Sequence, residues 1–80
     1  MTDDRIVQIY SLLDELEEED ISSFLRERFS LIRTMLSSSD SLSLRIDRVR
    51  SILDELDEES DIDSFIRSQL WRISVCIESL

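Results

Sequence analysis

Clustered carboxylates are the feature of this 80-residue sequence that most suggests chemistry. They form two runs about 40 residues apart, Glu17, Glu18, Glu19 and Asp20, and then Asp57, Glu58, Glu59, Asp61 and Asp63. Paired carboxylates can serve as general acid and base, or they can bind a divalent cation. Both activities depend on spacing and burial, so the pattern around each run decides between them.

The spacing of the second run does not match a known cation loop. When Asp57 is aligned with the first ligand of an EF-hand, Ile62 stands where glycine is required and Ser68 where a bidentate glutamate is required. A di-metal site in a helical bundle uses Glu-x-x-His pairs, and the sequence contains no histidine. We therefore predict no metal and no other cofactor, and we expect Ca²⁺ or Mg²⁺ to act only through ionic strength.

Catalytic groups of other kinds are also missing from the sequence. There is no glycine for a phosphate-binding loop, and no histidine to activate the single cysteine, Cys76. Cys76 is expected to be a small core residue. We predict that the protein is not an enzyme, with a carboxylate-based or metal-dependent hydrolase as the alternative.

The charge balance excludes two classes of partner. Nineteen acidic residues against nine arginines give a formal net charge of -10, which opposes binding to nucleic acid or to an anionic membrane surface. No apolar run approaches the ~20 residues of a membrane-spanning helix, and the first residues lack the basic start of a secretion signal. We expect a cytoplasmic protein, in agreement with its lone cysteine.

The two halves of the chain resemble each other. Residues 13–16 recur as residues 53–56, and after one inserted residue, residues 20–26 recur in similar form as residues 61–67. With that insertion, 9 of the first 19 positions and 7 of the next 20 are identical between the halves. This pattern predicts two repeats of the same local structure, residues 1–39 and residues 41–80.

Apolar residues within each repeat follow the three-and-four spacing of amphipathic helices. The pattern predicts helices over roughly residues 3–19, 22–37, 43–59 and 63–79. Because the links are short, neighbouring helices must run antiparallel. The prediction is an all-α single domain over residues 1–80, an up-down-up-down four-helix bundle built from two tandem helical hairpins. Two stacked repeats of an α-solenoid are the alternative.

The apolar stripes define a predicted core. It includes Phe24, Phe29, Phe65 and Tyr10, and it includes Ile21 and Ile62, which lie in equivalent turns and should fold inward at the end of each hairpin. Serine and aspartate at the predicted breaks provide helix caps in a chain that has neither glycine nor proline.

This topology collects the carboxylates at one end of the bundle. Residues 14–24 carry six acids and residues 54–64 carry seven, without an arginine in either window. This acidic pole is either a solvated tip, a docking face for a basic partner, or a weak cation site. Arg26 and Arg67 lie within reach of it. Four other arginines, Arg33, Arg45, Arg48 and Arg50, should gather at the opposite pole.

Two residues of the last helix interrupt an otherwise polar outer face. Trp71 falls nearly opposite the predicted core stripe and Val75 lies one turn further on, whereas the first repeat has Ser30 and Thr34 at these positions. Tryptophan is enriched at the centres of protein interfaces. Trp71 and Val75 therefore either anchor a protein contact or cover the flank of the bundle.

The second half also resembles a known family. Leu53-Asp54-Glu55-Leu56, Asp61-Ile62, Arg67, Leu70-Trp71-Arg72-Ile73 and Ile77-Glu78-Ser79 are similar to a group of small archaeal proteins known as uncharacterised protein family 0147. The resemblance implies an all-helical bundle of archaeal, cytoplasmic origin, and it implies no activity or catalytic residue. In the family a proline follows the turn isoleucine, whereas Ser22 and Asp63 stand here.

These observations favour a non-enzymatic protein-protein interaction or structural module, which uses the acidic pole and the face formed by Trp71 and Val75. A structural subunit that is stable only as an oligomer is a further alternative. The expected partner is another protein or a second copy of the chain. No small-molecule ligand is predicted.

Overall fold

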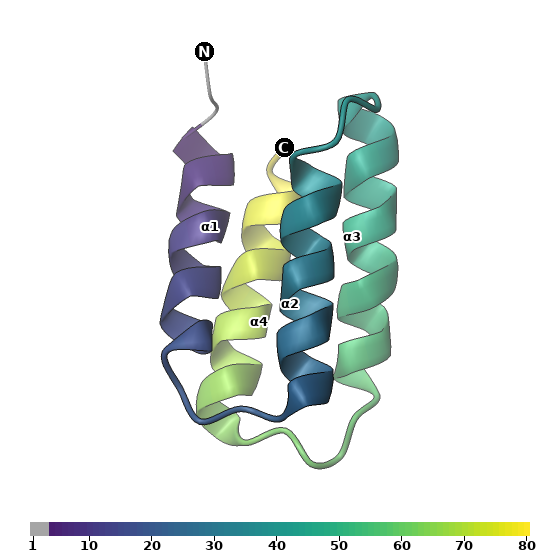
Figure 1. Cartoon of the computed structure of the whole chain (residues 1–80). Helices are drawn as coiled ribbons and strands as arrows, with labels where there is room; N and C mark the ends of the chain where they lie inside the picture. The colour runs from purple at the N-terminus through teal and green to yellow at the C-terminus, as the bar shows by residue number, and fades with distance from the viewer. Residues whose placement is uncertain (1–3) are drawn as a thin grey trace.

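The computed structural model describes residues 4–80, which form four α-helices (Figure 1). The helices are α1 (Asp4–Glu17), α2 (Ser23–Leu36), α3 (Leu42–Asp57) and α4 (Ser64–Glu78). Within these residues there is no strand. The all-helical prediction is confirmed, with the helix ends one or two residues inside the predicted bounds, except that α3 begins one residue earlier. The predicted first residue of the first helix, Asp3, lies outside the described part of the chain.

Side-chain caps define where three of the helices begin. The hydroxyl of Ser22 accepts a hydrogen bond from the backbone N–H of Leu25, and the carboxylate of Asp63 accepts one from Ile66 at the corresponding place in the second hairpin. Ser41 caps α3 in the same way. Each cap satisfies a backbone donor that the first turn of a helix leaves free.

The helices pack as a closed antiparallel bundle. α1 lies against α2 and α4, and α3 lies against α2 and α4, so the two hairpins are joined along two long interfaces (Figure 1). The loop after α1 and the loop after α3 lie at the same end, and the loop after α2 lies at the other. The chain measures 34 × 20 × 20 Å. This is the predicted up-down-up-down bundle, and not a pair of stacked solenoid repeats.

One hydrophobic core runs through the bundle. It contains Ile21 and Ile62, which fold inward from the two loops as predicted. The residues that are most fully buried come from all four helices: Ile9, Leu13, Leu16, Phe29, Ile32, Leu36, Val49, Leu56, Ile73 and Ile77. Burial of these side chains supplies most of the free energy that holds the helices together.

The predicted core was wrong for two aromatic residues. Phe24 and Phe65 are 37 % and 45 % exposed, although the helical spacing places them beside the stripe. Gln69 is instead 4 % exposed, and Leu12 is also buried. Gln69 faces α1, where its amide donates to Glu15, whereas Phe24 and Phe65 lie at the edge of the core stripe.

Each helix ends against an arginine from the next helix around the bundle. The guanidinium of Arg26 donates to the backbone carbonyls of Glu17 and Glu19, that of Arg45 to Leu36 and that of Arg67 to Glu59. Arg5, in the first turn of α1, donates to the carbonyl of Ser79 at the end of α4. These contacts place a positive charge at the negative end of each helix dipole.

Candidate functional site

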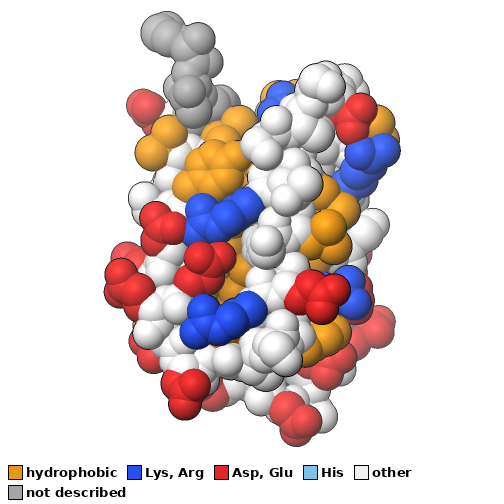
Figure 2. Space-filling view, in the orientation of Figure 1, with side chains coloured by type: hydrophobic (Ala, Val, Ile, Leu, Met, Phe, Trp, Pro, Cys, Tyr) orange, Lys and Arg blue, Asp and Glu red, His pale blue; other side chains and the backbone are white. Residues whose placement is uncertain are grey.

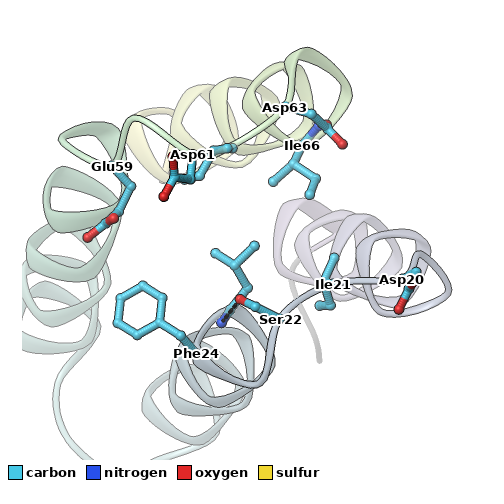
Figure 3. A pocket seen from close by; sticks show the side chains of 10 residues that line it. Asp20, Ile21, Ser22, Phe24, Glu59, Asp61, Asp63 and Ile66 are labelled. Atoms are coloured by element: carbon cyan, nitrogen blue, oxygen red, sulfur yellow. Dashed lines mark hydrogen bonds between the residues drawn. The ribbon is translucent and has the colours of Figure 1, made fainter.

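The two loops at the acidic pole enclose a pocket of about 380 Å³ (Figure 3). Its floor is apolar and its rim is acidic. The lining residues are Ile21, Phe24, Leu25, Ile62 and Ile66, with Ser22, Asp20, Glu59, Asp61 and Asp63 around them. The residues come from both loops and from the first turns of α2 and α4. We refer to this site as the end pocket.

The carboxylates of the end pocket come from both loops. In Figure 3, Glu59 and Asp61 extend from the loop after α3, and Asp20 lies across from them on the loop after α1. Their side chains have no hydrogen-bond or ion-pair partner within residues 4–80, whereas Asp63 is engaged as the cap of α4. The site therefore combines an apolar surface with carboxylates that are free to bind a cation.

Arginines reduce the negative charge of the acidic pole more than the sequence suggested. Glu17 pairs with Arg33, and Glu55 pairs with Arg28 at 3.3 Å. Basic side chains lie among acidic ones over α1 and α2 in Figure 2. Of the predicted pole residues, Glu17 is thus neutralised, while Glu18, Glu19, Asp57 and Glu58 are exposed and unpaired in the described part of the chain.

The prediction that Arg33 lies with the other arginines at the opposite pole is wrong, because Arg33 pairs with Asp14 and Glu17. Its guanidinium fills the seam between α1 and α2, where Nε lies 3.1 Å from Glu17, a second nitrogen contacts Asp14, and the ring of Tyr10 lies beneath it at 5.9 Å. Partial burial alone would lower the pKa of Arg33. Hydrogen bonds and Coulombic attraction from Glu17 and Asp14 outweigh that effect and raise the pKa above its ordinary value.

The two interfaces between hairpins carry equivalent polar pairs. Arg28 on α2 pairs with Glu55 on α3, and Gln69 on α4 donates to Glu15 on α1 at 2.6 Å. Gln69 and Glu55 lie 41 and 40 residues after their counterparts, Arg28 and Glu15. The long interfaces of the bundle are therefore built alike, although the second pair is neutral on one side.

The seams within the hairpins differ. In the second hairpin, a pocket of about 270 Å³ lies between α3 and α4, lined by Arg50, Leu53, Asp54, Ser74, Ile77 and Glu78. We refer to it as the seam pocket. Ser74 stands 41 residues after Arg33, and Asp54 stands 40 residues after Asp14. Aligning the two halves could have revealed this difference from the sequence, because a long basic side chain is replaced by a short one.

Trp71 and Val75 are exposed, as the helical spacing predicted. Trp71 is 68 % exposed, more than any other large hydrophobic side chain in residues 4–80, and Val75 lies on the same outer face of α4. Trp71 is three residues before Ser74, so it lies next to the seam pocket on the helix surface. The structure thus places Trp71 and Val75 on one exposed face of α4, and neither residue lines the end pocket or the seam pocket.

The described residues hold neither a candidate metal centre nor a candidate membrane span, and the one cysteine is buried. No group of three or more histidine, cysteine, aspartate or glutamate side chains is arranged to hold a metal ion within residues 4–80. Cys76 is a free thiol in the core. In the same part of the chain, none of the helices combines the length and apolarity that crossing a bilayer requires.

No family model, curated protein or solved structure matches this chain. The resemblance to uncharacterised protein family 0147 therefore stays a prediction.

Proposed function

We propose that the protein is a non-enzymatic interaction module that binds a basic, partly apolar segment of a partner protein in the end pocket. The observation that carries this proposal is the combination of an apolar floor and free rim carboxylates in one pocket. An apolar side chain of the partner would displace water from the floor, and neighbouring lysine or arginine side chains would pair with Asp20, Glu59 or Asp61.

The size and charge of the site support a protein segment as its occupant. About 380 Å³ is near the lower end of the ~300–1,000 Å³ range of ligand pockets, so it accepts a few side chains. The formal net charge of -10 attracts a basic partner from a distance and repels acidic ones. The half-exposed ring of Phe24 extends the apolar surface to the rim.

The test uses a synthetic helix-forming peptide of leucine and lysine, followed by amide chemical shifts of the protein. We expect saturable binding with the largest shifts in the two loops around Ile21 and Ile62, and weaker binding at higher salt. A peptide with serine in place of leucine tests the apolar floor. Equal affinity for that peptide would mean that charge alone drives binding, which would contradict the proposal.

Two pairs of variants locate the binding site. Phe24→Ser should weaken binding roughly fivefold by removing apolar contact, and Asp61→Asn roughly threefold by removing a rim charge. Leu44→Ser and Asp47→Asn make the same changes near the opposite end of the bundle and should leave binding unchanged. Equal effects of both pairs would place the peptide elsewhere.

We also propose that Trp71 and Val75 form a second contact surface, with a second copy of the chain as the occupant tested first. A tryptophan that is 68 % exposed loses unfavourable contact with water when it is covered. Sedimentation at increasing concentration should show association that Trp71→Ser abolishes. Val7→Ser removes an exposed apolar side chain from α1 and should not affect it. Association that survives in Trp71→Ser would exclude this surface.

A further inference from the structure

The seam pocket between α3 and α4 lies where the first hairpin holds the side chain of Arg33. Arg33 is the residue that fills the seam between α1 and α2, and its counterpart in the second hairpin, Ser74, lines the pocket. The other walls also correspond, because Leu53 and Ile77 stand in the places of Leu13 and Leu36. The first hairpin therefore shows what kind of group fits this seam.

We propose that the seam pocket binds an arginine side chain supplied by a partner protein. The acceptors would be Asp54, which corresponds to the Arg33 partner Asp14, and Glu78, which lies on α4 at the same pocket. The side chains of Asp54 and Glu78 have no partner within residues 4–80. A guanidinium offers several N–H donors in a planar fork, so it can contact two carboxylates at once, as Arg33 does.

The caps and the cross-helix contacts of the two hairpins otherwise correspond, which supports the interpretation of the seam pocket as an unfilled position. The caps Ser22 and Asp63 correspond, and so do the carbonyl contacts of Arg26 and Arg67. The pairs Arg28–Glu55 and Gln69–Glu15 correspond across the two long interfaces. The seams within the hairpins are the exception. Ser74 stands in the second hairpin where the first has Arg33, so the second seam lacks a charged side chain and its space is open.

Two residues near the seam pocket, Trp71 and Arg50, restrict the chemistry of the partner. Trp71 lies one turn before Ser74 on the outer side of α4, so a protein that covers Trp71 could direct an arginine into the pocket. Arg50 stands in the place of Tyr10 and lines the same pocket, so it gives the site one positive charge against two negative ones. The site therefore favours a single guanidinium held close to Asp54 and Glu78.

The probe for this site is N-acetyl-arginine amide, compared with N-acetyl-lysine amide, and the readout is the set of backbone amide shifts. We expect saturable, millimolar binding of the arginine compound with shifts at Asp54, Ser74 and Ile77, and weaker binding of the lysine compound. Equal shifts for both compounds, or shifts spread evenly over the acidic surface, would overturn the proposal.

Ser74→Arg reproduces the first hairpin and should fill the pocket from within. It is expected to abolish binding of the arginine compound and to raise the melting temperature by on the order of 3 °C, because the new side chain pairs with Asp54. Ser68→Arg adds the same charge to an exposed position of α4 outside the pocket. It should keep the binding, and loss of binding in both variants would show an effect of net charge alone.

Arg50→Tyr separates a guanidinium site from an anion site. It recreates the ring that lies beneath Arg33 in the first hairpin and removes the competing charge, so binding of the arginine compound should tighten. Weaker binding would show that Arg50 holds the carbonyl groups of the probe and would count against the proposal. Phe24→Ser and Asp61→Asn, which test the end pocket, should not change these results, so the two sites can fail independently.

Discussion

At the scale of single residues, Arg33 is the side chain whose role differs most from expectation. It joins α1 to α2 through two carboxylates and one aromatic ring, with about a third of the side chain exposed. The hydrophobic period could not place it, because periodicity gives the face of a helix but not which partner helix that face meets. The pairing depends on the register of the hairpin, which a single sequence does not define.

Replacing Arg33 by serine should make the first hairpin like the second. Arg33→Ser removes both ion pairs and leaves the half-buried Glu17 without a partner, so the free energy of unfolding should fall by about 1 kcal/mol. Urea unfolding measures the loss. Arg72→Ser removes an exposed arginine that has no partner in the described residues, and it should change stability little. Equal losses would mean that the pairs of Arg33 contribute nothing specific.

Exposure of the aromatic residues was predicted in part. The position of Trp71 opposite the core stripe was sufficient to predict its exposure, because it differs from the core direction by nearly half a turn. Phe24 and Phe65 lie about a quarter turn from the stripe, where a small rotation of the helix decides whether a side chain is covered. On α4 the covered position is instead Gln69, whose side chain donates to Glu15 on α1.

At the scale of elements, the helices owe their limits to side-chain capping. The sequence contains neither glycine nor proline, so no left-handed residue ends a helix, and none of the described residues has a positive φ. The serine and aspartate caps were predictable, since these residue types stand at breaks in the apolar pattern. For the arginines that contact the carbonyl ends of the helices, the sequence predicts only that they lie near those ends. The contacts themselves depend on the conformation of the loop between the two helices.

Removal of the Asp63 cap should destabilise the second hairpin. Asp63→Ala loses the hydrogen bond to the N–H of Ile66, for which the cost is about 1 kcal/mol. Asp61→Ala, two residues earlier, removes the same charge without a cap and should stabilise slightly by relieving repulsion. Thermal unfolding followed by circular dichroism compares the two variants. Equal melting temperatures would contradict a capping role for Asp63.

At the scale of the whole molecule, charge is distributed unevenly along the bundle axis. The windows 14–24 and 54–64 hold thirteen of the nineteen acidic residues. Arg26, Arg28, Arg33 and Arg67 turn toward that end in the structure, yet most of its carboxylates stay unpaired. Repulsion among them opposes folding and is strongest at low ionic strength.

Salt should therefore stabilise the protein. Raising sodium chloride from low to moderate concentration should increase the melting temperature, because the ions screen repulsion within the acidic pole. Glu58→Gln combined with Glu59→Gln should raise the melting temperature at low salt and reduce its dependence on salt. Asp47→Asn combined with Glu78→Gln removes the same charge outside the two acidic windows. This control should raise the melting temperature at low salt by a smaller amount. A salt response that is identical in all three proteins would refute the uneven charge distribution as its cause.

Arg5 holds the end of α4 just as Arg26, Arg45 and Arg67 hold the ends of the other three helices. The four helices thus form a ring of like junctions, three of which are also linked by the backbone. A circularly permuted chain, joined from residue 80 back to α1 by a flexible linker and cut within residues 37–41, would retain all of the core contacts. The stability of the bundle therefore depends on the contacts between neighbouring helices, and not on the order of the helices along the chain.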